Sequence, residues 1–134
     1  MRVCFDTNVL VSAFATRGLA ADALRVVLAE HELLVPELVL DEFGRVLRRK
    51  LRAPEGVVST AEQLLRLQTV VPMAPVPAEP HVRDRSDARI RAAAGAGGAE
   101  VLVTGDRDLL DAAASSPIPV VTPRELWSRL RAGR

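Results

Sequence analysis

The sequence is poor in cysteine and in aromatic residues, and it has no long apolar run. Its single cysteine, Cys4, cannot form an internal disulfide, so we expect a buried, inert thiol in a protein of the reducing cytoplasm. Aromatic residues make up 3% of the chain, so stacking platforms for single-stranded bases are not evident. No apolar run approaches the length of a membrane span, and we see no signal-peptide pattern. A disulfide scaffold is excluded, and a membrane protein is not expected.

The chain is also not strongly charged. Its formal net charge is +1 and its pI is about 8.0, which does not suggest a protein coated in basic patches. Arginines nevertheless gather in residues 45–52 and 124–134. With 134 residues, 49% of them hydrophobic and 26% charged, we expect one globular domain spanning residues 1–134.

Short apolar runs alternate with segments of helical spacing. The runs predict buried strands at residues 3–5, 33–35, 70–71, 101–103 and 118–121. The segments between them predict helices at residues 9–15, 19–29, 36–51, 87–94 and 109–114, one beginning near residue 59, and a last one from 123 to about 130. This alternation predicts an α/β fold with a mostly parallel sheet sandwiched between helices, in three layers.

Three local motifs predict where helices begin. Pro36 is well placed as the first residue of a helix. The spacing of Ser59 and Glu62 matches a capping box, so we expect a helix to begin there. Thr122 and Pro123 predict the start of the last helix, with Thr122 as its N-cap and Pro123 as its first residue.

Acidic residues stand where strands or helices are expected to meet loops. Asp6 follows the first strand directly, and Asp106 and Asp108 follow the strand at residues 101–103. The carboxyl ends of strands are where α/β sheets keep their chemistry, so we expect these acids to converge with Glu42 and the Asp84/Asp87 pair. Carboxylates held this close need a compensating cation. Magnesium or manganese is therefore expected, and such an ion can activate water for phosphodiester hydrolysis.

Each acid also has a purely structural interpretation. Asp6 and Asp106 can cap the helices that follow them, and Asp87 gains from the dipole of its own helix. Glu42 can pair with Arg45 or Arg49 on the same helix. Capping alone does not require acids at the ends of the two most apolar strands, which favours a shared site.

Other polar residues near these acids have the same two interpretations. Asn8 can orient a metal-bound water or a phosphate, as can Thr7 and Thr104, or each can serve only at a helix start. Arg45 and Arg49 can guide a polyanion towards the site, or simply form a solvated helix face.

Four segments together resemble a known family. They are the run of residues 3–12 around Asp6-Thr7-Asn8, Glu42, the Arg83-Asp84-x-x-Asp87 segment, and residues 102–110 with Thr104-Gly105-Asp106-Arg107-Asp108. In this order they resemble the PIN-domain family, in particular the VapC-like toxin components of bacterial type II toxin-antitoxin systems. The likeness covers residues 2 to about 127.

The resemblance implies a metal-dependent endoribonuclease using Mg²⁺ or Mn²⁺. It implies a central parallel sheet with the first strand in the middle, a homodimer, and a cognate antitoxin that covers the site. The acidic quartet that it implies is Asp6, Glu42, Asp87 and Asp106. The supporting residues are Asn8, Thr104 and Asp108, with Asp84 as a spare ligand or a cap.

Other functions remain to be weighed against the nuclease. A haloacid-dehalogenase phosphatase needs an acid at the position of Asn8. A response-regulator receiver domain needs a lysine near a late strand, and a dinucleotide-binding fold needs a glycine-rich turn after its first strand. The chain has none of these. The remaining alternative is a PIN-like module that binds RNA or a protein without cutting.

Overall fold

The computed structural model describes residues 1–73, 85–111 and 116–133, apart from the side chains of residues 85–87 and 108. Within these residues the chain forms a five-stranded sheet in which every neighbouring pair is parallel. The order is β3-β2-β1-β4-β5, which places β1 in the middle as expected. The strands are β1 (Arg2–Phe5), β2 (Glu32–Pro36), β3 (Thr69–Val71), β4 (Val101–Val103) and β5 (Val120–Val121).

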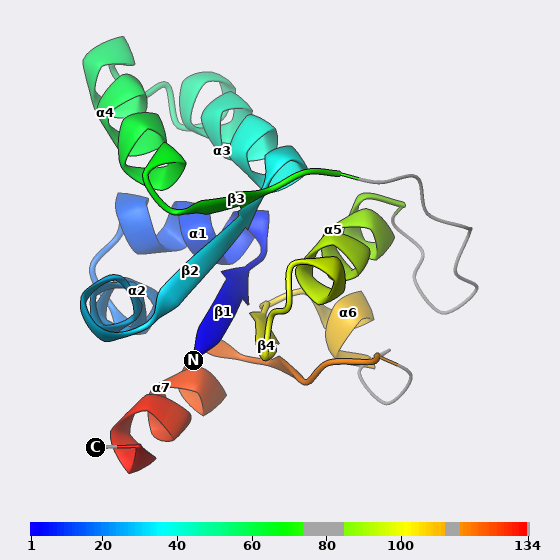
Figure 1. Cartoon of the computed structure of the whole chain (residues 1–134). Helices are drawn as coiled ribbons and strands as arrows, with labels where there is room; N and C mark the ends of the chain where they lie inside the picture. Colours follow the sequence, from blue (N-terminus) through cyan, green and yellow to red (C-terminus); the bar gives the residue numbers. More distant parts are fainter. Residues whose placement is uncertain (74–84, 112–115, 134) are drawn as a thin grey trace.

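Helices cover both faces of this sheet. Figure 1 shows α1 and α2 on one side of the central strands, and α5 and α6 on the other. The helix α7 packs on α2, and α3 packs on α1 and α4. The predicted three-layer α/β/α arrangement is therefore confirmed. The helices are α1 (Thr7–Ala15), α2 (Leu19–Glu30), α3 (Glu37–Arg49), α4 (Glu55–Arg66), α5 (Arg85–Ala96), α6 (Arg107–Asp111) and α7 (Pro123–Ala132).

The central strands are buried on both faces, which is why they read as continuous apolar runs. Val3, Cys4 and Leu102 have no exposed surface. The pKa of the Cys4 thiol is raised, first by burial and then by the nearby negative charge of Asp6. The expectation of a buried cysteine is thus confirmed.

Two of the three predicted helix starts are wrong. The helix α3 begins at Glu37, because Pro36 ends β2 and has the extended backbone of an N-cap residue. The helix α4 begins at Glu55, four residues before the predicted capping box at Ser59. Glu62 instead accepts a hydrogen bond of 2.7 Å from Arg48 Nη2 on α3. Contact between two helices thus overrides a motif that is purely local.

The third predicted start is confirmed. Thr122 caps α7 by accepting a hydrogen bond of 3.2 Å from the backbone N–H of Glu125, and Pro123 is the first helical residue. The strand before it is shorter than predicted and contains only Val120 and Val121. No helix in the described ranges is long and apolar enough to cross a membrane.

Candidate active site

The sheet brings the ends of β1 and β4 together. The two strands are parallel neighbours in which Phe5 pairs with Val103. Immediately beyond this pair, the backbone N–H of Asp6 donates to the carbonyl of Val103 at 2.9 Å. Asp6 and the segment that begins at Thr104 therefore leave the sheet side by side, at its carboxyl edge.

Asp6 is buried, with 4% of its surface exposed. Its Oδ1 accepts a hydrogen bond of 3.0 Å from the N–H of Val9 and so caps α1. Its Oδ2 accepts a hydrogen bond from the hydroxyl of Thr104. Burial raises the pKa of Asp6, the two hydrogen bonds oppose this rise, and the negative charges of Asp106 and Glu42 add to it. The cap is real, but a cap alone does not explain a carboxylate buried beside two others.

Thr104 connects Asp6 to the second acidic segment. Its hydroxyl, which has no exposed surface, accepts a hydrogen bond of 2.9 Å from the backbone N–H of Asp106 while donating to Asp6. Asp106 Oδ1 accepts from the N–H of Leu109 at 3.3 Å, at the start of α6. One hydroxyl thus joins the carboxylate of Asp6 to the backbone of Asp106.

Glu42 comes to this edge from α3. Its Oε1 accepts a hydrogen bond of 2.9 Å from the hydroxyl of Thr7, the first residue of α1. The partner of Glu42 is therefore Thr7, and the described ion pairs do not include one from Glu42 to Arg45 or Arg49. Those two arginines are exposed on α3. We refer to Asp6, Glu42 and Asp106 as the acidic edge.

For three other predicted site residues, the structure gives the position of the backbone at most. Asp87 lies in the first turn of α5 and Asp108 in α6, but the positions of their side chains are not described. Asp84 lies outside the described residues. Among the side chains that are described, no three acids, histidines or cysteines lie close enough together to hold a metal ion. The ligand roles of the quartet therefore stay predictions.

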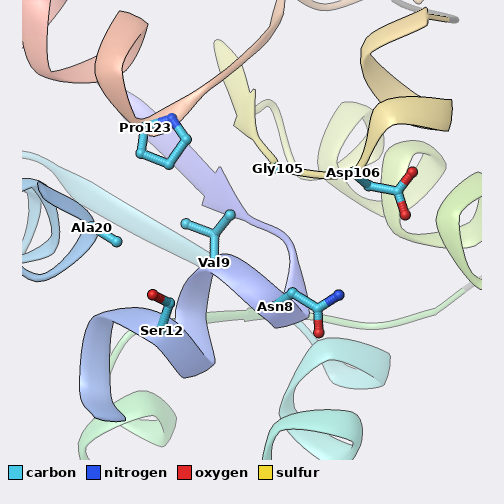
Figure 2. Close-up of a pocket in the computed structure, with 7 residues that line it drawn as sticks. All are labelled: Asn8, Val9, Ser12, Ala20, Gly105, Asp106 and Pro123. Carbon is cyan, nitrogen blue, oxygen red and sulfur yellow. The ribbon is translucent and has the colours of Figure 1, made fainter. Parts of the chain in front are cut away.

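A cavity adjoins the acidic edge. Figure 2 shows it between the start of α1 and the loop after β4, with the side chains of Asn8 and Asp106 at the same end. Asn8 is exposed, so its amide can reach a ligand in the cavity. Its predicted supporting role is compatible with this position.

Thr7 has a function that the sequence did not reveal. Its position beside Asp6 suggests contact with a water or a phosphate. In the structure Thr7 is buried, with 8% of its surface exposed, and its hydroxyl donates to Glu42. Only the approach of α3 to α1 creates this bond, and the two residues lie 35 positions apart. No local pattern contains it.

The fold and the acidic edge define an α/β/α protein with its polar site at the carboxyl ends of parallel strands. The chain belongs to the PIN-domain family, whose sequence model matches residues 2–108. Its fold is similar to that of a chain in the crystal structure of VapBC2 from Rickettsia felis bound to a DNA fragment from their promoter. The TM-score is 0.59 at 13% identity, covering 91% of this chain and 98% of that one. No match was found among curated proteins.

Proposed function

We propose that this protein is a metal-dependent endoribonuclease that hydrolyses RNA phosphodiester bonds, and that it is the toxin of a type II toxin-antitoxin system. Membership in the PIN-domain family supports the nuclease class. The observation that carries the proposal is the buried Asp6 carboxylate, whose pKa is raised by burial and by the charges of Asp106 and Glu42. A buried carboxylate that is repelled by two partly exposed ones at a strand edge is costly to ionise unless a cation joins it.

The donor atoms suit a hard divalent ion. All of them are carboxylate oxygens, which Mg²⁺ and Mn²⁺ prefer. Each oxygen of Asp6 accepts one hydrogen bond from the protein, and a carboxylate oxygen can accept a second interaction. Without a cation, like charge opposes close approach of the three acids. We propose that Asp6, Glu42, Asp87 and Asp106 hold the ion, with Asp108, Asp84, Asn8 and Thr104 in support.

The chain's own residues would orient this site. Thr104 joins the carboxylate of Asp6 to the backbone of Asp106, and Thr7 donates a hydrogen bond to Glu42. The bound ion would supply activated water and stabilise charge on the phosphoryl oxygens. No histidine is needed as a base, and His31 is engaged elsewhere, at 3.2 Å from the amino terminus of Met1.

The proposed partners follow from the same comparison. The likeness to a chain of a VapBC2 complex supports an antitoxin as a protein partner. We further propose a homodimer acting on cytoplasmic RNA, with Arg45 and Arg49 guiding the polyanion towards the site.

A cleavage assay tests the proposal. The partner-free protein is incubated with a structured and an unstructured RNA in manganese, magnesium or chelator. Cleavage should require the metal and should be lost in Asp6→Asn, Asp106→Asn and Glu42→Gln. The matched control is Asp41→Asn, because Asp41 is exposed and adjacent to Glu42 in α3. Folded protein that binds neither ion and cuts neither RNA would instead favour a non-catalytic RNA-binding or protein-interaction module.

A further inference from the structure

The cavity beside Asp106 has the size of a small-ligand site. Its volume is about 330 Å³, near the lower end of the roughly 300–1,000 Å³ that small-molecule pockets occupy. It extends from Asn8 and Asp106 at one end to Ala20 on α2 at the other, with Pro123 of α7 opposite α1 (Figure 2). The cavity is therefore continuous with the acidic edge but reaches well beyond it.

The walls of the cavity are aliphatic, and polar groups lie along its α1 side. Val9, Ala20 and Pro123 provide apolar contact surface. Asn8 provides a carboxamide that both donates and accepts, and Ser12 provides a hydroxyl. Such a combination suits a planar ring with hydrogen-bonding edges, because an amide can pair with the edge of a base. The hydroxyl of Ser12 already lies 3.3 Å from the hydroxyl of Thr16, and its oxygen can still accept a hydrogen bond from a ligand.

Helices also begin around this cavity. Asn8 and Val9 lie in the first turn of α1, Ala20 is the second residue of α2, and Pro123 is the first residue of α7. The N-cap of α2, Gly18, makes no side-chain capping bond. Side chains already cap α1 and α7, at Asp6 and Thr122, so of these three helices it is the uncapped positive end of α2 that favours an anion nearby, such as the phosphate attached to the ring.

We propose that this cavity is a nucleotide subsite, which takes the base and ribose next to the scissile phosphate of an unpaired RNA strand. This inference rests on the proposed nuclease function. The aliphatic walls contact the base, Asn8 and Ser12 hydrogen-bond its edge or the ribose, and the acidic edge lies where the next phosphodiester follows. The residues that line the cavity then determine which base is preferred at the cut.

Nucleotide binding can be measured without metal or cleavage. Each of the four nucleoside 5′-monophosphates is titrated into the protein in chelator, and the backbone amide resonances of Ser12, Ala20 and Gly105 are followed by NMR. At least one nucleotide should shift all three. Ribose 5-phosphate, which lacks the base, should bind about tenfold more weakly, a loss of about 1.4 kcal/mol. Equal binding of ribose 5-phosphate, or no shift with any nucleotide, would overturn the subsite.

The matched variants are Ala20→Leu and Ala29→Leu, on the same helix. Leucine at position 20 fills the cavity and should weaken nucleotide binding about tenfold or more. Ala29 is exposed near the other end of α2, so Ala29→Leu should bind like the unchanged protein. If Ala20→Leu does not fold, Gly105→Leu replaces it, since Gly105 lines the cavity and a Cβ there has no atom within 4 Å. Unchanged affinity in the folded cavity-filling variant would refute the assignment.

The two proposals fail in different ways. Asp6→Asn should abolish RNA cleavage without weakening nucleotide binding in chelator, whereas Ala20→Leu should weaken that binding and change the base preference at the cut. Metal-dependent cleavage without nucleotide binding in the cavity would overturn the subsite alone. No cleavage by folded, metal-bound protein would overturn the nuclease and, with it, the assignment of a scissile phosphate.

Discussion

The hydroxyl of Thr104 donates a hydrogen bond to Oδ2 of Asp6, which lies 98 positions earlier in the chain. Both residues are buried, and the same hydroxyl accepts from the backbone N–H of Asp106. The side chain that directly follows β4 therefore joins the carboxylate after β1 to the backbone of the acidic segment after β4.

Replacing Thr104 by valine should destabilise the protein. The side chain keeps its shape but loses both hydrogen bonds, so a buried carboxylate and a backbone N–H lose a partner, at a cost of about 1–3 kcal/mol. The free energy of unfolding is measured by urea denaturation at pH 7 in chelator. Thr104→Ser keeps the hydroxyl and should retain most of the stability. Equal stability of the valine variant and the unchanged protein would show that this bridge contributes nothing.

Asp6 should make the metal-free protein less stable as pH rises. Its pKa is raised in the folded state, first by burial, so the folded protein binds its proton more tightly than the unfolded chain does. The stabilisation from this proton is complete below the ordinary aspartate pKa and is lost as pH rises through the raised folded pKa. Asp6→Asn should therefore gain stability relative to the unchanged protein as pH increases.

The measurement is the difference in free energy of unfolding between Asp6→Asn and the unchanged protein across pH 3 to 8, in chelator. Taking the difference cancels the other titrating groups. Added manganese should reverse the order at pH 7, since only the unchanged protein has the carboxylate proposed to bind it. A difference that does not change with pH would contradict the raised pKa.

Thr7→Val should weaken metal binding without removing any proposed ligand. The variant loses the 2.9 Å hydrogen bond that directs Glu42 to the acidic edge. Losing an orienting partner of this kind typically costs about 10–100-fold in metal affinity. Manganese affinity is measured by calorimetry. Thr60→Val on α4 is the matched control, because Thr60 is exposed and bonds only within its own helix. Equal manganese affinity in the two variants would show that Thr7 does not orient a metal ligand.

Cys4 should resist thiol reagents in the folded protein. Burial, together with the negative charge of Asp6, raises its pKa, so the reactive thiolate is suppressed and also inaccessible. Labelling by a disulfide reagent in native buffer should proceed only as fast as the protein unfolds, and immediately in urea. Rapid labelling of native protein would show that β1 is less well buried than the structure indicates.

Much of the sheet was predictable, because strands buried on both faces leave continuous apolar runs in the sequence. The runs at residues 3–5, 33–35 and 101–103 lie within β1, β2 and β4. Helix starts were less predictable. The spacing of Ser59 and Glu62 is a local motif that predicted a helix start. The helix begins earlier, and Glu62 bonds to Arg48 where α3 packs on α4.

The candidate site divides in the same way. Asp6 and Asp106 could be identified because an acid after an apolar strand is a local pattern, and parallel strands end at one edge. The partner of Glu42 could not, since Arg45 and Arg49 are near in sequence while Thr7 is near only after α3 packs on α1. Whether Asp87 completes the metal site stays a prediction.

Local hydrophobicity and local chain order encode the alternation of strands and helices and the acids at the strand ends. Which side chains bond to those acids, and where a cavity opens beside them, depends on tertiary packing. The Thr104 to Asp6 bond and the cavity joining α1, α2 and α7 connect residues far apart in the chain. Their geometry depends on how the elements pack, and no local pattern encodes it.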